Sequence, residues 1–398
     1  MNAASDNRTR SDLGRANRRA VLGEIVVNGS LSRTAIAART GLTGASVSRI
    51  TRELIDAGLV TERQAEGEAS GPGRRFVDLA LNPEGGFVLG IGLNLFQQSV
   101  SLADLQNRLI ERVDLGLASL HDPEVVIGRI AEVAKDIVGR LGSGRARLLG
   151  GSIAITGAAD PTTGMMRESP ILRWRDVDIG GKLSKALDLP MLVESLPNAI
   201  VSAETRFGVA RERHHVLLFN CALGIGAGIY TDGTLLRGRN FTAGVISNVP
   251  AIGADLPGLT LDEAASGIGV LRRLGISPGP DGRRIAGNEE AAKLLQVLQA
   301  GNEGDAVCAD AIAAAGRTLG NALCQFAGLI APELVVLSGP VAQSPHYVAA
   351  VEEALGDDAP PFKVSTLSPQ AAARWLAIGE FLVNRDLDLD TLHLREAS

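Results

Sequence analysis

Cysteine is scarce in this chain, and long apolar runs are missing from it. Cys221, Cys308 and Cys324 lie far apart, so neighbouring residues can build neither a disulfide framework nor a CxxC metal site. The longest nearly apolar stretch, residues 216–230, contains Asn220 and three glycines, which excludes a membrane span. The first twelve residues are polar and lack the apolar core of a secretory signal. We therefore expect a cytoplasmic protein.

Positive charge is concentrated at the start of an otherwise acidic chain. The 398 residues carry 39 Lys or Arg and 45 Asp or Glu, a net charge of −6. Residues 1–80 hold twelve Arg against nine acidic residues (+3), which leaves 27 against 36 (−9) for the rest. A basic head on an acidic body indicates a polyanion-binding module joined to a second unit of one or two domains.

The head has the pattern of three short helices. Apolar residues recur at helical spacing over 13–28, and two further helices are predicted over 33–40 and 44–57. Ser32 and Thr43 are typical N-cap residues, and Gly41 suits the tight turn between the second and third helices. This arrangement predicts a helix-turn-helix over 13–81, preceded by a flexible tail over 1–12.

Two predicted strands, 59–64 and 75–81, enclose the glycine-rich segment EGEASGPGRR and complete a winged helix. Short hydroxyls and arginines on the third helix are typical of major-groove contacts, and arginines in a wing suit the minor groove. The expected DNA-binding residues are Thr43, Ser46, Ser48, Arg49, Arg52, Arg74 and Arg75. Two alternatives remain open: the module is an interaction domain with solvated arginines, or Arg49 and Arg52 pair with Glu53 or Asp56.

The body shows two similar series of elements. Strands are expected at 87–96, 99–104 and 109–115, followed by a helix at 123–141 and a strand at 148–156. The second series has strands at 216–220, 227–231 and 235–237, a helix at 305–329 and a strand at 334–337. This pattern predicts two α/β lobes with a cleft between them, but periodicity leaves the relation of the lobes open.

Several segments, taken in order, resemble the transcription-factor branch of the ROK family. They are the GPGRR wing, VLGIGLNLFQQSVSLADL, GGSIAITGAADPTTG, LVESLPNAIVSAETRFG, GIGAGIYTDGTLLRGRNFTAGVISN and LGNALCQFAGLIAPELVVLSGP. The resemblance implies an α/β fold in which a winged helix precedes a two-lobed body of the actin and hexokinase (ribonuclease H-like) type. Lobe I would span about 82–200 plus a C-terminal helix at 371–388, and lobe II about 201–370. It also implies a homodimer or dimer of dimers that binds an inverted-repeat operator in double-stranded DNA, most simply as a repressor of carbohydrate genes.

The departures from the family's kinases are informative. Their DxGxT-like phosphate loop reads Gly92, Asn94, Leu95 and Phe96 here, and their ENDAN segment with its catalytic aspartate reads ESLPN, with Leu196 in the place of the base. Their AGExGH segment reads AGVISN, and residues 249–261 contain no cysteine for the family's zinc site. We therefore expect neither enzymatic activity nor a cofactor or metal.

An effector site remains possible in the altered sugar pocket. Its candidate residues are Ser195, Leu196, Asn198, Val245, Asn248 and Asp262. Because Leu196 and Val245 are apolar, the expected small-molecule effector is less hydroxylated than a hexose or has an apolar substituent. Two other functions stay open: a DNA-binding scaffold that senses no ligand, and, less favoured, a sugar kinase with a DNA-binding head.

Overall fold

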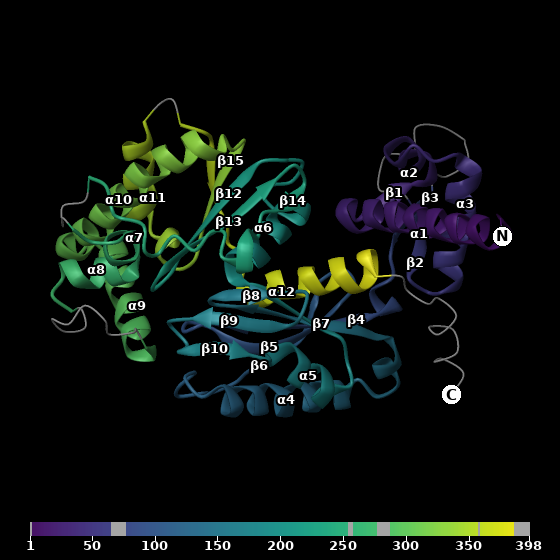
Figure 1. Cartoon of the computed structure of the whole chain (residues 1–398), viewed down its shortest axis with the longest axis horizontal. Coiled ribbons are helices and arrows are strands. Elements are labelled where there is room, and N and C mark those ends of the chain that lie inside the picture. The colour runs from purple at the N-terminus through teal and green to yellow at the C-terminus, as the bar shows by residue number, and fades with distance from the viewer. Residues whose placement is uncertain (1, 65–76, 254–257, 277–286, 357–358, 386–398) are drawn as a thin grey trace.

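The computed structural model describes residues 2–64, 77–253, 258–276, 287–356 and 359–385, with side chains from residue 13 onward. A small head and two α/β lobes are visible in Figure 1, with the head beside the carboxyl end of the long helix that lies between the lobes. The predicted mixed α/β class, with an N-terminal helix-turn-helix and a two-lobed body, is confirmed. No helix in the described ranges combines the length and apolar character that a membrane crossing requires.

The head contains three helices and a three-stranded sheet of order β1-β3-β2. Its elements are α1 (Asn2–Asn28), β1 (Ser30–Ser32), α2 (Arg33–Thr40), α3 (Gly44–Asp56), β2 (Val60–Gln64) and β3 (Val77–Leu81). Helix α1 begins at Asn2 and so includes most of the span that was predicted as a tail, and residues 2–12 contain neither glycine nor proline to stop a helix. Strand β1 was not predicted, because three residues are too few to show the alternating pattern of a strand.

Local capping signals fix the helix-turn-helix as predicted. The Ser32 side chain accepts a hydrogen bond from the Ala35 N–H, and the Thr43 side chain accepts one from the Ser46 N–H. Gly41 ends α2 with φ of 69°, a left-handed conformation that favours glycine. These caps set the turn that positions α3 on the head.

Lobe I is built on a five-stranded sheet of order β11-β7-β4-β5-β6. Helices α4 and α5 cover one face of this sheet (Figure 1), and a small sheet of β8, β9 and β10 adjoins it. The elements are β4 (Phe87–Leu93), β5 (Gln98–Asp104), β6 (Leu109–Asp114), α4 (Pro123–Arg140), β7 (Leu148–Ile155), β8 (Ala158–Asp160), β9 (Met165–Ser169), β10 (Trp174–Val177), α5 (Ile179–Leu187) and β11 (Met191–Ser195).

Lobe II repeats the same topology with the order β14-β13-β12-β15-β16. In each sheet the first strand pairs antiparallel with the second and parallel with the fourth, so the two lobes are structural repeats. The elements are α6 (Leu196–Phe207), β12 (Val216–Cys221), β13 (Ile225–Thr231), β14 (Thr234–Leu235), α7 (Leu261–Ala265), α8 (Gly267–Arg273), α9 (Asn288–Asn302), α10 (Ala306–Ile330), β15 (Leu334–Ser338), α11 (Pro345–Leu355) and β16 (Phe362–Val364). The expected lobe boundary at residue 200 falls inside α6.

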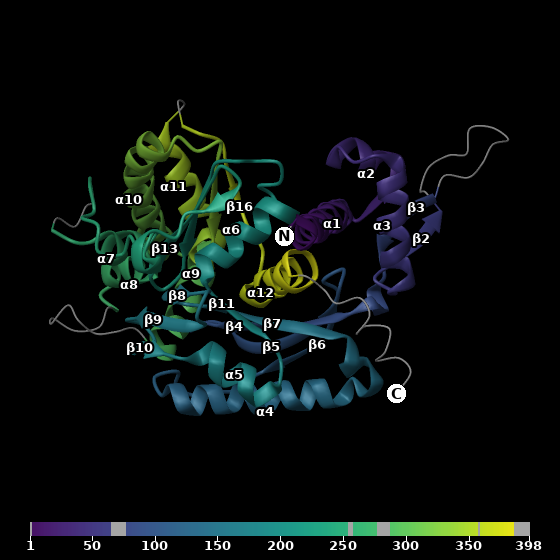
Figure 2. The ribbon, with the colours of Figure 1, turned by 45° about the vertical axis from the view of Figure 1, so that its right-hand side comes forward.

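The last helix of the described chain lies where the two lobes and the head meet. Helix α12 (Pro369–Ile378) lies between the lobes and continues into a π-helical turn, Gly379–Asn384, beside α1 of the head (Figure 2). It starts earlier than the helix expected at 371–388, because Ser368 caps it and Pro369 suits a first helical turn. It also ends earlier than expected: the α-helix stops at Ile378, the π-helical turn stops at Asn384, and Arg385 is extended, whereas residues 386–388 lie outside the described ranges.

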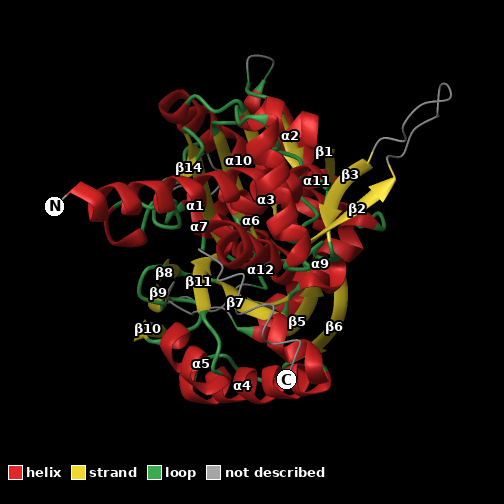
Figure 3. Cartoon of the chain, turned by 90° about the vertical axis from the view of Figure 1, so that its right-hand side faces the viewer, coloured by secondary structure: helices red, strands yellow, loops and turns green. Residues whose placement is uncertain are grey.

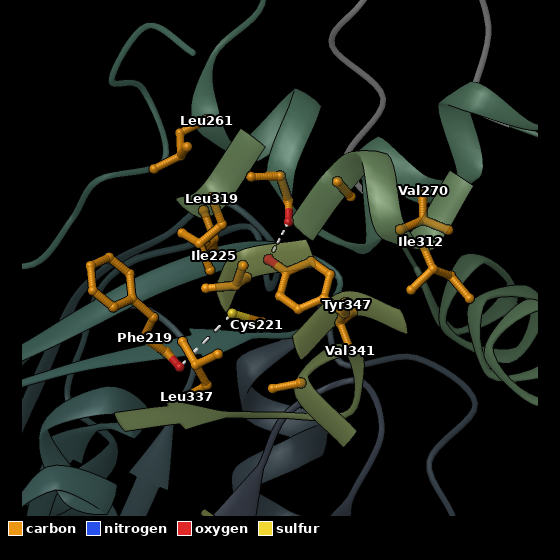
Figure 4. Close-up of a cluster of buried hydrophobic side chains, with 14 of the residues drawn as sticks. Phe219, Cys221, Ile225, Leu261, Val270, Ile312, Leu319, Leu337, Val341 and Tyr347 are labelled. Atoms are coloured by element: carbon orange, nitrogen blue, oxygen red, sulfur yellow. Dashed lines mark hydrogen bonds between the residues drawn. The ribbon is translucent and has the colours of Figure 1, made fainter. Parts of the chain in front are cut away.

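Clusters of buried apolar side chains stabilise the lobes and the contact between the head and the body. The core of lobe II surrounds Phe219 and Tyr347, whose hydroxyl donates to the Ala265 carbonyl oxygen at 2.7 Å (Figure 4). Another cluster is shared between head and body: Val21 and Ile25 of α1 pack in it together with Val88 of β4 and Phe381 of the π-helical turn. The head is therefore packed against lobe I and is not merely tethered to it.

Candidate nucleic-acid interface and lobe junction

Helix α3 presents a polar face to solvent while its opposite face enters the core. Val47, Ile50 and Leu54 are buried, as their spacing of three and four residues predicts. The candidate DNA-binding residues of this helix lie on the other side: Thr43, Ser48, Arg49 and Arg52 are exposed and Ser46 is half-buried. Figure 3 shows α3 beside α1 and the two long strands of the head.

Hydrogen bonding distinguishes these candidates from one another. The Thr43 hydroxyl donates to Ser46 Oγ at 3.0 Å while its oxygen caps the helix, so these two side chains already have partners. Arg49 Nη1 lies 2.5 Å from Glu53 Oε1, which is the intrahelical pairing that the sequence left open. Arg52 has no hydrogen-bond or ion-pair partner within the described ranges, so its guanidinium is available for a phosphate or a base edge.

Two further residues of this surface were not among the candidates. Ala45 is exposed on the same helical face as Ser48 and Arg52, and its methyl group is of a size that suits a thymine methyl. Arg63 is exposed on β2 and, like Arg52, has no described partner. Ala45 could have been predicted as part of this surface from the sequence, because positions 45, 48, 49 and 52 fall on one face of a helix. Arg74 and Arg75 lie outside the described residues.

At the lobe junction, a buried carboxylate joins the two halves of the body. Glu194, at the end of β11, is 1% exposed, and its Oε2 accepts from Arg237 Nε at 3.0 Å and from Nη2 at 2.8 Å. Its Oε1 accepts from the Ser195 N–H and from Asn198 Nδ2, at 2.9 and 3.1 Å. The structure thus brings two predicted site residues, Ser195 and Asn198, onto one carboxylate that the candidate list did not include.

The remaining cleft candidates fall into different environments. Leu196 is 4% exposed and packs in an apolar cluster with Ala154 of β7, whereas Val245 is 52% exposed in a loop. The two apolar candidates therefore differ in environment, and a common apolar wall formed by both stays a prediction. Asn248 is also exposed. Asn198 is 4% exposed, and among the residues that the structure describes its Oδ1 atom has no hydrogen-bond partner.

Asp262 is held at the start of α7. Its Oδ1 accepts from the Ile225 N–H at 2.7 Å, and its own N–H donates to the Ser247 carbonyl oxygen at 3.1 Å. Burial raises the pKa of the Asp262 carboxyl to about 6, although the Ile225 N–H opposes that rise. Asp262 thus keeps a hydrogen-bonding group beside β13, and its backbone is bonded to Ser247 in the loop that carries Val245 and Asn248.

The segment that resembles the phosphate loop of the family's kinases carries apolar side chains that pack against the lobe cores. Leu95 packs against the cores of both lobes, and Phe96 packs against the core of lobe II. A Cβ atom on Gly92 would lie 3.1 Å from the Gln370 backbone nitrogen and 3.1 Å from its Oε1, so α12 closes in on this position. Gly228 similarly allows close approach of α6, because its Cβ would lie 2.7 Å from the Pro197 carbonyl oxygen. Gly226 and Gly228 are inside β13 and not in the hairpin turn.

A cavity of about 360 Å³ lies elsewhere, between the carboxyl end of α6 and the start of α12. Its walls include Phe207 and Trp375, whose rings stack with centroids 3.7 Å apart. None of the six candidate effector residues lines it. In the described ranges, no three His, Cys, Asp or Glu side chains gather as a metal site would require.

Comparisons with known proteins agree with this architecture. Residues 130–368 match the model of the ROK family, and residues 11–69 match that of the MarR family. The chain is 26% identical over 336 residues to the xylose repressor of Caldicellulosiruptor bescii, covering 82% of this chain and 83% of that one. It is 24% identical over 343 residues to the DNA-binding transcriptional dual regulator NagC of Escherichia coli K12, covering 83% and 82%.

Solved structures show the same fold. A ROK family transcriptional regulator described as a homologue of the E. coli MLC protein superposes with a TM-score of 0.72, at 22% identity, over 96% of this chain and 99% of that one. A ROK family glucokinase from Streptomyces griseus superposes with a TM-score of 0.58, at 18% identity, over 73% of this chain and 98% of its own. Because the ROK model matches more than half of its residues, this protein belongs to the ROK family.

Proposed function

We propose that this protein is a DNA-binding transcriptional regulator that represses genes of carbohydrate metabolism in the cytoplasm. The observation that carries the proposal is the exposed face of α3, with Ser48, Arg49 and Arg52, on a winged helix joined to a ROK body. Relatives over more than four-fifths of the chain are a xylose repressor and a regulator named NagC. Two copies would place two recognition helices on an inverted-repeat operator.

We do not propose sugar kinase activity, although kinases share the fold. A kinase needs a base for the sugar hydroxyl and room for a metal-bound phosphate. Leu196 cannot accept a proton, and Leu95 and Phe96 pack into the lobe cores where the phosphate loop would be open.

For regulation, we propose a small effector that contacts the loop-and-junction residues Ser195, Asn198, Asn248 and Asp262. The unpartnered Oδ1 of buried Asn198 supports a ligand with a hydrogen-bond donor, because an unsatisfied buried acceptor is costly. Leu196 is 4% exposed and Val245 is 52% exposed, so a ligand would meet these two side chains in different environments. The ligand would be less polar than a hexose, and its coupling to DNA binding would be about 1–3 kcal/mol.

The packing of Leu95 and Phe96 favours a second candidate, a scaffold that represses without sensing a ligand. Apolar side chains of one lobe that enter the core of the other restrict the opening that a ligand would use. A thermal-shift screen of sugars, sugar acids and polyols separates the two, since a ligand at a hundred times its Kd adds about 2.7 kcal/mol of stability.

The test of the main proposal is selection of bound duplexes from a random-sequence library with the full-length protein. We expect an inverted repeat to be enriched and to occur upstream of carbohydrate genes in the source genome. Enrichment of no sequence over several rounds would refute sequence-specific regulation.

A further inference from the structure

One carboxylate on the recognition helix is shared by two arginines from different helices. Glu53 of α3 contacts Arg49 Nη1 through Oε1 at 2.5 Å and Arg18 Nη2 of α1 through Oε2 at 3.4 Å. Its side chain is 33% exposed, so water screens both pairs only in part. Glu53 therefore holds a candidate DNA contact and is itself held from α1.

The next residue along α1 connects this cluster to the body. Arg19 Nη2 donates to the Asn384 carbonyl oxygen, at the end of the π-helical turn that follows α12, at 2.6 Å. Gly23, one turn later, lies against Val383 of the same segment: a Cβ there would be 3.6 Å from Val383 Cγ1. Figure 2 shows α1 beside the carboxyl end of α12. The position of α1, and with it of Arg18, is thus set by the body.

We propose that Glu53 is a positioning residue that withholds Arg49 from DNA, and that Arg18, placed by the body, competes with Arg49 for it. The inference rests on the proposed DNA-binding function and adds its control element. A closer approach of Arg18 to Glu53 neutralises the carboxylate and releases Arg49. A retreat of Arg18 leaves Glu53 to hold Arg49 and to repel phosphate.

Charge alone makes a different prediction from competition. If each side chain acted only through its own charge, replacing Arg18 would weaken DNA binding equally with and without Glu53. If Arg18 and Arg49 compete for Glu53, replacing Arg18 weakens DNA binding more when Glu53 is present than when it is absent. The reason is that Glu53, once Arg18 is gone, holds Arg49 more firmly. The two effects are therefore coupled, and the coupling requires Arg49.

The test measures binding of full-length Glu53→Gln, Arg18→Gln and the double variant to a selected operator and to a random-sequence duplex by fluorescence anisotropy. We expect Glu53→Gln to tighten binding to both duplexes by about 2- to 5-fold. Its logarithmic salt slope should steepen by about 0.9, equivalent to one more phosphate contact. Arg18→Gln should weaken binding by more in the parent than in Glu53→Gln, and this difference should vanish when Arg49 is also replaced by Gln.

A matched control is available in the same head, where Arg33 Nη2 pairs with Glu62 Oε1 at 2.7 Å and Arg33 Nε donates to Oγ1 of Thr51, a buried residue of α3. Arg33→Gln and Glu62→Gln should be additive in DNA binding. Additive effects of Arg18→Gln and Glu53→Gln, with each variant melting within a few degrees of the parent, would overturn the inference. If the parent protein binds no duplex, the proposed function fails instead, so the two failures are distinguishable.

Discussion

Glu194 and Arg237 form a two-point contact across the lobe junction, with both Arg237 Nε and Nη2 on one oxygen of a carboxylate that is almost wholly buried. Glu194 ends a strand of lobe I, and Arg237 follows β14 of lobe II. The pair links the two halves of the body directly. It offers a direct way to weaken the junction.

Arg237→Ala should destabilise the protein by about 1–3 kcal/mol, because it leaves the Glu194 carboxylate buried without its cation. The cost stays below that of a fully buried pair because the Arg237 side chain is 37% exposed. Urea unfolding measures it. Arg239→Ala, at an exposed position in the same loop, should change stability by less than about 0.5 kcal/mol, and equal effects of the two would contradict the assigned role.

Asp262 should make stability depend on pH in a defined window. Its pKa is about 6 in the folded protein against 3.8 for the ordinary carboxyl, so the folded state binds the proton more tightly. This residue's contribution to stability is therefore present below about pH 4 and is lost as pH rises through about 6. Asp262→Asn keeps an acceptor for the Ile225 N–H and should match the parent near pH 4 but exceed it by about 1–2 kcal/mol at pH 7. A stability difference that is the same at both pH values would disprove the shift.

The core shared by head and body should make them unfold together. Phe381 is 3% exposed in that cluster, and Phe381→Ala should cost about 3–5 kcal/mol. Hydrogen exchange at the β2 and β3 amides should accelerate together with exchange in β4. Leu329→Ala, at a side chain that is 81% exposed, serves as the control. Faster exchange in β4 with unchanged exchange in the head would show that the two parts are not coupled.

Replacing Leu196 alone should not create a sugar kinase. Leu196→Asp restores a carboxylate at the aligned position but leaves Leu95 and Phe96 packed between the lobes. ADP release with glucose and ATP should stay at the no-enzyme level in both the parent and the variant. Turnover above that level in the parent would contradict the proposed loss of catalysis.

Local signals in the sequence predicted much of the head. Ser32, Gly41 and Thr43 make hydrogen bonds to residues within four positions of them, so a local sequence pattern is enough to predict their roles. The pairing of Arg18 with Glu53 joins residues 35 positions apart and depends on how α1 packs, which no local pattern encodes. The same holds for the opposite environments of Leu196 and Val245, because an aligned motif does not fix side-chain direction.

The central claim, sequence-specific DNA binding through the exposed face of α3, is tested most directly by the affinity of full-length Arg52→Ala for a selected operator across a salt series. Because Arg52 is exposed and unpaired within the described ranges, we expect the variant to lose about 1–3 kcal/mol of binding free energy, or about 5- to 150-fold in affinity. Arg108→Ala, an exposed arginine of lobe I, should bind as the parent does. Equal affinity of parent and Arg52→Ala at every salt concentration would contradict the account.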